Sequence, residues 1–321
     1  MMDKPQPVDR IVVLVATYQR DDFLSRLFGS LENQTQSIYA VVVSDNAASE
    51  STRTLVCRQY RFETKYLALP ENPGCGSGLA HAMRKACELW GSDLIFLIFD
   101  DDAVPEKDAV SLLYEGMKDE EALLVAPMLV KKDGSRDGGP ELKSFSLNRM
   151  LKSNTSPVDA RRLLSGMHPE FIWCKGPAMM VSHQAVKMCG MHREDMWMLG
   201  EDIEYSMRLS AAGRCVFVPE ATVHHLPPPP RTDEGGHRKH MIKFLAMVQN
   251  LAFMGVCLAH ARKCLTYLPS HILRYLITFR SFYDWGYLVR ALWNGAVRHE
   301  PAGKPSGKNW RDNVMVKFGL D

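Results

Sequence analysis

Three aspartates stand side by side, Asp100, Asp101 and Asp102, directly after an apolar run at residues 94–99. Like charges this close repel one another, and some of the carboxyl groups would have to be protonated unless a cation is present. Oxygen ligands suit Mg²⁺ or Mn²⁺ rather than zinc or copper, and a phosphate-bearing substrate would complete the coordination. Alternation along an extended chain directs Asp100 and Asp102 to one side and Asp101 to the other. A solvated acidic turn, or a set of caps for a helix beginning near Pro105, is the alternative explanation.

A second acidic cluster, Glu201 and Asp202, opens a predicted helix. Carboxylates at that position interact favourably with the unpaired N–H groups of the first turn, and Glu204 with Arg208 forms an i,i+4 pair. These structural roles are sufficient to explain the cluster, and the residues by themselves favour the structural explanation over a catalytic one. The functional alternative is a general base, because a carboxylate partly shielded from water can take a proton from an incoming hydroxyl.

Two further features of the sequence could bind a metal ion or a ligand. His224 and His225 are adjacent at the end of a predicted strand, so they point to opposite faces, and a neutral imidazole can bind Mn²⁺. A lone histidine is more often structural than a metal ligand. The glycine-rich segment 72–78 follows the third strand, and it fits neither a dinucleotide fingerprint nor a P-loop, which would end in Lys-Ser/Thr.

The elements that must position these residues alternate between strand and helix. Strands are predicted at residues 11–16, 39–43, 65–69 and 94–99. Helices are predicted at residues 21–31, at 50–60, and from the glycine-rich loop to Trp90. Such alternation predicts an α/β fold with a parallel sheet, whose ligands lie beyond the carboxyl ends of the strands. Polar residues follow all four strand ends, namely Thr17, Asp45, Asn72 and Asp100 to Asp102.

The second half of the chain is less regular. Further strands are predicted at residues 123–126, 178–181, 215–218 and 222–225, and helices at 184–188 and 202–212. The stretch 141–170 has weak periodicity and receives no assignment. The proline run 227–230 cannot be helical and is the predicted boundary between a catalytic domain, residues 1–230, and a helical extension, residues 231–321.

Composition narrows the class of protein. The 321 residues have a formal net charge of +2, which argues against a dedicated nucleic-acid binder. The eight cysteines form no C-x-x-C pair, so a zinc cluster is not expected. The N-terminal residues lack the apolar segment of a secretory signal, and no apolar run approaches the length of a membrane-spanning helix. These observations predict a cytoplasmic protein, soluble or peripheral on the inner face of the membrane.

The motifs, in this order, resemble those of the family 2 glycosyltransferases with the GT-A fold. They are Val-Ala-Thr-Tyr-Gln-Arg at 15–20, Ser-Asp-Asn at 44–46, Asn-Pro-Gly at 72–74, Phe-Asp-Asp-Asp at 99–102, Gly-Glu-Asp at 200–202 and a closing strand that ends at His225. The resemblance covers roughly residues 11–225. Within the family, Asp-Asp-Asp together with Glu-Asp-x-Glu-Tyr-x-x-Arg looks most like bacterial rhamnosyl- and galactofuranosyltransferases.

The resemblance implies an inverting transfer from a nucleotide-diphosphate sugar, UDP- or dTDP-linked, to a glycan or lipid-linked acceptor in surface polysaccharide assembly. It assigns Mn²⁺ or Mg²⁺ to Asp100, Asp102 and His225, with His225 matching better than His224, and it makes Asp202 the base. Donor contacts are expected from Thr17, Asp45, Asn72, Asp100 and Asp101. Acceptor contacts are expected from Trp173, Trp197 and Glu201, although core or rim packing explains the tryptophans equally well.

Two other functions fit the same fold class. A sugar-nucleotide-forming nucleotidyltransferase usually has a glycine-rich basic loop after the first strand, where residues 17–21 contain no glycine. A non-catalytic carbohydrate-binding protein could have lost the aspartates that this chain retains.

The extension interleaves basic and apolar residues, which predicts amphipathic helices able to lie on an anionic membrane. The residues concerned are Arg238, Lys239, Lys243, Arg262, Lys263, Arg274 and Arg280, with Phe244, Leu245, Tyr267, Leu268, Tyr275 and Phe279. Packing on the catalytic domain, or a homo-oligomer contact, is the simpler alternative.

Overall fold

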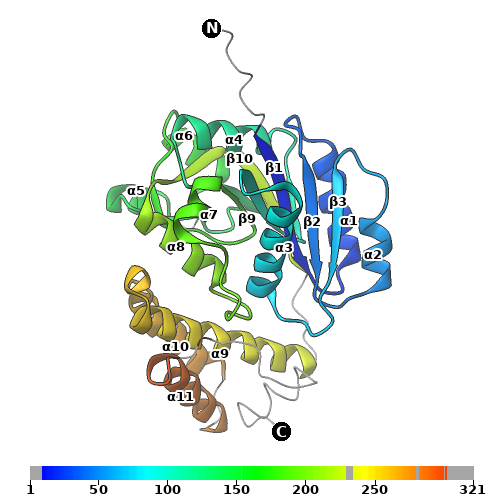
Figure 1. The fold of residues 1–321 in the computed structure, drawn as a ribbon. Coiled ribbons are helices and arrows are strands. Elements are labelled where there is room, and N and C mark those ends of the chain that lie inside the picture. The colour runs from blue at the N-terminus through cyan, green and yellow to red at the C-terminus, as the bar shows by residue number, and fades with distance from the viewer. Residues whose placement is uncertain (1–8, 153, 229–233, 280–281, 300, 302–321) are drawn as a thin grey trace.

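The computed structural model describes residues 9–152, 154–228, 234–279, 282–299 and 301 (Figure 1). The first part of the chain alternates between strand and helix as predicted. Its elements are β1 (Arg10–Thr17), α1 (Asp21–Glu32), β2 (Ala40–Asp45), α2 (Glu50–Val56), β3 (Glu63–Ala68), α3 (Cys75–Trp90) and β4 (Leu94–Asp100). The glycine-rich segment is not the loop that the sequence predicted, because α3 already begins at Cys75 and contains Gly76 and Gly78.

The middle of the chain completes the sheet. Its elements are β5 (Ala103–Pro105), α4 (Ala109–Asp119), β6 (Leu124–Lys131), β7 (Glu141–Leu142), α5 (Phe145–Met150), α6 (Pro157–Leu163), β8 (Phe171–Trp173), β9 (Ala178–Val181), α7 (His183–Cys189), α8 (Glu201–Ala212) and β10 (Cys215–His225). The described residues of the unassigned stretch 141–170 therefore form one short strand and two short helices. The two strands predicted at 215–225 are one strand, in which a bulge between Val218 and Thr222 interrupts the pairing with β6.

The aspartates do not cap a helix at Pro105. Residues 103–105 form β5, which pairs antiparallel with the end of β10, and α4 begins only at Ala109. This pairing decides the position of the second half of the site, because it places His225 opposite Ala103, one residue beyond the aspartates.

The sheet has eight strands in the order β3-β2-β1-β4-β9-β6-β10-β5. Strands β3, β2, β1 and β4 run parallel, as do β6 and β10, whereas β9 is antiparallel to both of its neighbours. The sheet is therefore mostly parallel. Alternate residues of β1 point into different hydrophobic clusters, Val13 with α1 and α4 and Leu14 with α3 and α8, so the sheet is buried on both faces.

The C-terminal extension is helical, as predicted, with α9 (Glu234–Cys257), η1 (Ala259–Ala261), α10 (Cys264–Thr278) and α11 (Phe282–Ala296). In Figure 1, α9 lies between the sheet and α11, whereas α10 also contacts β8 directly, through Tyr267 and Trp173. One cluster packs α9 against α10 and α11, and a second packs α9 against Met207 of α8. The predicted boundary at 227–230 lies partly outside the described residues.

One helix of the extension passes a membrane-span test that the sequence pattern did not suggest. The segment His240–Cys257 of α9 is long and apolar enough to cross a membrane by length and composition, with a mean hydropathy of 1.3. The sequence run is interrupted by Lys243, Gln249 and Asn250, which is why it did not stand out. Because 67% of this segment is buried inside the fold, a core helix explains its composition.

Candidate active site

The carboxyl ends of the strands bring the two halves of the site together. Asp100 ends β4 and lies beside Ala16 of β1, while His225 ends β10. The backbone N–H of Leu226 donates to the carbonyl of Asp102 at 2.9 Å, which fixes the end of β10 against the aspartates. Residues that are more than one hundred positions apart in the chain therefore meet at one edge of the sheet.

Asp100, Asp102 and His225 form one group of potential metal ligands. One ligand atom of each lies within 4.8 Å of the others, and the Nε2 of His225 is 3.4 Å from an Oδ1 of Asp102. His224 points elsewhere, with its Nε2 3.1 Å from Oε1 of Glu106. Two carboxylates and an imidazole are a donor set that suits Mn²⁺ and is compatible with Mg²⁺.

The two aspartates of this group are electrostatically different. Burial raises the pKa of Asp100 to about 7, and the charges of Asp102 and Asp101 add to this. Burial alone would also raise the pKa of Asp102, but contacts with His225 and Arg20 lower it below its usual range. Within the described part of the chain, the carboxylate of Asp100 has no hydrogen-bond partner, so it is available to a ligand.

A line of polar contacts supports His225. Its Nδ1 contacts the carboxylate of Asp137, which in turn is 3.0 Å from Nζ of Lys175. Burial by itself would lower the pKa of His225, but Asp102 and Asp137 raise it to about 9. A metal-binding histidine commonly donates its second ring N–H to a carboxylate, which orients the ring. No sequence pattern predicted Asp137 or Lys175, because each acts only through a partner distant in the chain.

Asp101 does not face away from Asp102 as alternation predicted, because residues 101–102 form a turn and both carboxylates contact the same nitrogen of Arg20. It is 3% exposed, and it accepts hydrogen bonds from Thr17 Oγ1 at 2.7 Å and from Arg20 Nη1 at 2.9 Å. The same Nη1 lies 2.9 Å from Asp102 Oδ2. In this structure Thr17 and Asp101, both expected to contact the donor, bind each other, and Arg20, to which the sequence assigned no role, neutralises part of the acidic cluster.

The second acidic pair, Glu201 and Asp202, begins α8 near the group of potential metal ligands. Asp202 is half-buried, and its carboxylate accepts the N–H of Gly176 at 2.7 Å and that of Ile203 at 2.8 Å. Burial raises the pKa of Asp202 and of Glu201, and their mutual repulsion adds to the shift at Glu201. The charge of Asp202 also raises the pKa of Asp100, so the carboxylates of the two motifs share one electrostatic environment.

The glycine-rich segment packs against the chain that leads into α8. A Cβ on Gly74, whose φ is +94°, would lie 2.0 Å from the carbonyl oxygen of Trp197, and one on Gly76 would lie 2.6 Å from that of Met196. The N–H of Cys75 donates to the Trp197 carbonyl at 2.9 Å. The glycines are therefore required for close approach of two backbones, which sequence spacing could not distinguish from a ligand loop.

The expected acceptor residues lie in packed surroundings. Trp197 is 6% exposed and its indole N–H donates to the carbonyl of Asn72 at 3.3 Å. Trp173 is half-buried, and its indole N–H donates to Tyr267 of α10 at 2.9 Å. Both indoles thus have protein partners, as their structural explanation requires, and their contact with an acceptor stays a prediction.

Asp45, which was also expected to contact the donor, is engaged by the protein as well. Asp45 is fully buried, and its carboxylate accepts the N–H groups of Ala47 and Ser49 and the hydroxyl of Tyr66. Its neighbour Asn46 has a buried Oδ1 for which the described residues provide no partner. The end of β2 therefore offers an acceptor atom at Asn46, while Asp45 fixes the shape of the loop.

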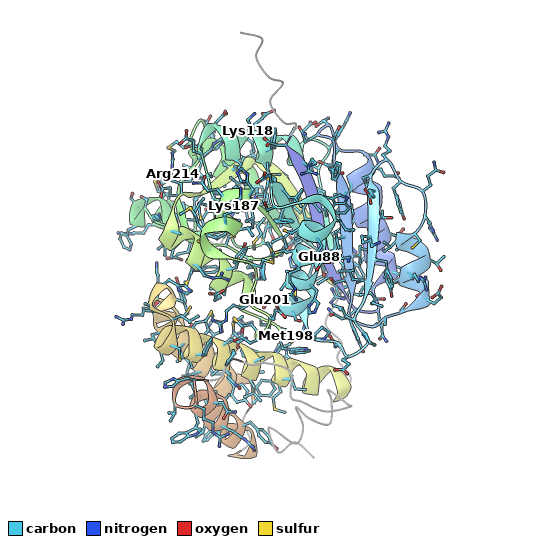
Figure 2. The ribbon with its side chains drawn as sticks, viewed as in Figure 1. Glu88, Lys118, Lys187, Met198, Glu201 and Arg214 are labelled. Atoms are coloured by element: carbon cyan, nitrogen blue, oxygen red, sulfur yellow. The ribbon has the colours of Figure 1, made fainter. Side chains whose placement is uncertain are left out.

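The extension holds the segment before α8 in a strained conformation. Leu199 has φ +61° and Gly200 has φ +102°, and a left-handed conformation is unfavourable for leucine. Asn250 of α9 donates to the carbonyls of Met198 and Leu199 at 3.0 Å and 2.7 Å. Figure 2 shows Met198 and Glu201 where the part of the chain that carries the sheet meets the extension, above α9. Strain that the surrounding contacts maintain is typical of functional segments.

A second contact joins α8 to the extension. Glu204 is 1% exposed and pairs with Arg208, whose nitrogens lie 3.0 Å and 2.9 Å from its carboxylate, as the sequence spacing predicted. His260 of η1 adds a third contact at 3.0 Å. Burial would raise the pKa of Glu204, but the bonds to His260 and Arg208 lower it below its usual range.

Comparison with known proteins agrees with this architecture. Residues 12–173 match the model of glycosyl transferase family 2. A search of curated proteins gave no significant match. Among solved structures, S. aureus TarS 1–349 in complex with UDP-GlcNAc has a TM-score of 0.58 and 14% identity over 91% of this chain and 82% of that chain. The same TarS fragment in complex with UDP has a TM-score of 0.53 and 13% identity over 96% and 88%.

The longer S. aureus TarS structure gives a TM-score of 0.54 and 14% identity over 88% of this chain and 49% of that chain. At these identities the structural likeness establishes the fold, and the family match establishes the class of activity, which favours glycosyl transfer over nucleotidyl transfer. The matched region covers half of the chain, from β1 to β8, and the protein is therefore a member of glycosyl transferase family 2 with a GT-A fold.

Proposed function

We propose that this protein is a metal-dependent, inverting glycosyltransferase that uses a nucleotide-diphosphate sugar. The observation that carries the proposal is the grouping of Asp100, Asp102 and His225 beside the half-buried Asp202, on one edge of the sheet. The family match ends at residue 173, so the roles of Asp202 and His225 rest on this geometry.

The residues at the edge fit a divalent cation, Mn²⁺ or Mg²⁺. Asp100 supplies a carboxylate without a described partner, Asp102 supplies an ionised one, and Asp137 orients the His225 ring from behind. When bound, the cation would neutralise charge on the leaving diphosphate. Arg20, which is 36% exposed and already contacts Asp102, adds positive charge at the same edge.

On the acceptor side, Asp202 takes the proton. The acceptor hydroxyl oxygen forms a bond to the anomeric carbon, the bond from that carbon to the diphosphate oxygen breaks, and the hydroxyl proton passes to the Asp202 carboxylate. Its two backbone hydrogen bonds hold the carboxylate in place without consuming all of its lone pairs. Attack from the side opposite the leaving group inverts the configuration at the anomeric carbon.

We propose a UDP- or dTDP-linked donor. Uracil and thymine each present an N–H flanked by two carbonyls, so their recognition requires an acceptor, and Asn46 Oδ1 lies directly after the end of β2. The likeness to TarS in complex with UDP-GlcNAc supports a uridine donor. A glycan or lipid-linked acceptor in surface polysaccharide assembly, on the cytoplasmic side of the membrane, completes the proposal.

Donor hydrolysis and transfer test this function. The protein is incubated with UDP-, dTDP- and GDP-sugars in the presence of Mn²⁺ or Mg²⁺, and the released nucleoside diphosphate is measured. We expect activity with a pyrimidine donor, its loss on chelation, and its loss in His225→Ala.

The adjacent His224→Ala is the matched control, because that ring contacts Glu106 on the opposite face. Equal activity of the two histidine variants, or activity that survives chelation, would contradict the assignment of the metal site. Inversion is checked separately by determining the anomeric configuration of the product.

A further inference from the structure

The outer faces of α10 and α11 expose apolar side chains at helical spacing. On α10, Leu273 and Ile277 are one turn apart and are 59% and 58% exposed, whereas Leu265 packs against Gly255 of α9. On α11, Trp285, Val289 and Trp293 recur every four residues, and Val289 and Trp293 are 65% and 53% exposed. Side chains this apolar rarely form exposed stripes on two neighbouring helices of a soluble protein.

These faces point away from the catalytic domain. The opposite faces of the two helices are buried in the cluster shared with α9, which contains Tyr275 of α10, Phe279 directly after α10, and Leu288 and Ala291 of α11. Figure 1 shows α11 on the side of α9 that is remote from the sheet. The aromatic residues that the sequence predicted at a membrane, Phe244, Tyr275 and Phe279, therefore pack internally, and a different set of residues forms the exposed face.

The extension also has a strong excess of positive charge. Within residues 240–299 the basic residues are Lys243, Arg262, Lys263, Arg274, Arg280, Arg290 and Arg298, whereas Asp284 is the one acidic residue. The whole chain has a formal net charge of +2, so the rest of the chain is acidic overall. Arg262, Arg274, Arg290 and Arg298 are exposed, and none of them forms an ion pair with another described residue.

Two of these exposed arginines directly follow residues of the apolar faces. Arg290 directly follows Val289, so α11 carries a guanidinium at the margin of its apolar stripe, whereas the guanidinium of Arg274, which follows Leu273, lies over the Phe244 ring of α9. Arginine at the border of an apolar helix face, with tryptophan on that face, is the pattern of helices that lie in the interface of an anionic bilayer.

We propose that the outer faces of α10 and α11 bind an anionic lipid bilayer. A second copy of the chain is disfavoured as the occupant, because pairing this face with itself would bring the unpaired arginines of both copies together. Each basic residue near an anionic surface contributes about fivefold in partitioning, equivalent to ~1 kcal/mol. The apolar side chains add to this by leaving water.

The binding does not rest on the proposed glycosyl transfer, but it has a consequence for it. The bilayer would be separated from the start of α8 by two helix layers, roughly 20 Å. Because α9 contacts the segment before α8 directly, a lipid-linked acceptor held in that bilayer would be presented to the half of the site that contains Asp202.

Flotation of the full-length protein with vesicles tests the proposal. Vesicles of phosphatidylcholine mixed with phosphatidylglycerol are compared with vesicles of phosphatidylcholine alone, at low and high salt. We expect flotation with the anionic vesicles, which weakens at high salt. In Val289→Glu/Trp293→Glu, partitioning should fall at least tenfold. In Arg290→Glu, it should fall more than fivefold, because charge reversal adds repulsion.

Val158→Glu is the matched control, since Val158 is 70% exposed on α6 in the catalytic domain. It should float like the wild type, and circular dichroism should show native helix content in every variant. The proposal is overturned if the wild type fails to float with anionic vesicles, or if Val158→Glu reduces flotation as much as the α11 variant. It is also overturned if light scattering finds a dimer that the α11 variant converts to a monomer without any effect on flotation.

Discussion

Replacing Asp202 by asparagine separates the chemical role of this side chain from its structural one. The aspartate accepts two backbone N–H groups, from Gly176 and from Ile203, one on each oxygen. Asparagine has a single side-chain oxygen, so its NH₂ group must face one of these two donors. The substitution therefore removes the proton acceptor and also leaves one backbone N–H without its partner.

The two effects have different magnitudes. A lost hydrogen bond with a buried unsatisfied donor costs about 1–3 kcal/mol, and each kcal/mol lowers the melting temperature of a large domain by roughly 2–4 °C. That cost leaves the protein folded at 25 °C, because native stabilities are of the order of 5–15 kcal/mol. Loss of a general base lowers the turnover number by about 10²- to 10⁴-fold.

The measurements are kcat, the donor dissociation constant and the melting temperature. Ser206→Ala is the matched control, because Ser206 Oγ accepts the N–H of Cys174 at 3.2 Å, two residues before Gly176, and its loss loosens the same junction. We expect a lower melting temperature in both variants, unchanged donor affinity in both, and a large loss of kcat in Asp202→Asn alone.

A pH profile adds a further readout. Burial raises the pKa of Asp202, and a base must be deprotonated, so wild-type kcat should increase with pH through a value above the ordinary pKa of about 3.9. If Asp202→Asn kept near-normal kcat, or if Ser206→Ala lost as much kcat, Asp202 would be a positioning residue and the reasoning would be refuted.

Three other predictions follow from the structure. Gly74→Ala should destabilise the protein by several kcal/mol in denaturant titrations, because its Cβ would lie 2.0 Å from the Trp197 carbonyl oxygen. The control is Gly29→Ala in α1, where a Cβ would meet open space, and this variant should be neutral or stabilised by about 0.5–1 kcal/mol. Asn250→Ala should cost about 1–3 kcal/mol and lower kcat, with donor affinity unchanged, because it releases the carbonyls of the strained segment before α8. Glu204 has a lowered pKa in the folded state, so the stability that it contributes is present above an ordinary glutamate pKa of about 4.3 and is lost as the pH falls below that value. The melting temperature of Glu204→Gln should therefore decline less between pH 5 and 3 than that of the wild type. Equal declines in the two proteins would exclude this ion-pair cluster as a cause of acid destabilisation.

The fold was largely predictable, because the patterns that specify its strands and helices lie within short stretches of the sequence. Residues 11–16 and 94–99 are continuous apolar runs, and each is followed by a helix-period segment, which is sufficient to predict parallel strands joined by crossovers. The alternation rule failed for Asp101 and Asp102, because residues 101–102 form a turn in which both carboxylates contact Arg20. Local rules failed at 103–105, where pairing with β10 makes a strand of residues that otherwise resemble a helix start.

The site was predictable only in part. Asp100, Asp102, Asp202 and His225 stood at strand or helix ends, where parallel sheets place ligands, and the structure brings them to one edge. The contacts that orient and charge these groups, from Arg20, Asp137 and Lys175, join residues far apart in the chain, so no spacing could reveal them. The glycines at 74 and 76 were visible as a motif, but their reason, a second backbone at close range, was not.

The sequence by itself determined the elements, their order and the types of side chain at the strand ends, because periodicity and strand termination are properties of neighbouring residues. Tertiary structure alone decided which of two adjacent histidines faces the aspartates, since that depends on the register of β10 against β5. It also decided which apolar residues of the extension are buried against α9 and which remain on the surface. Both outcomes depend on packing between segments that are distant in the chain, and the free energy of that packing is gained only when the segments come into contact.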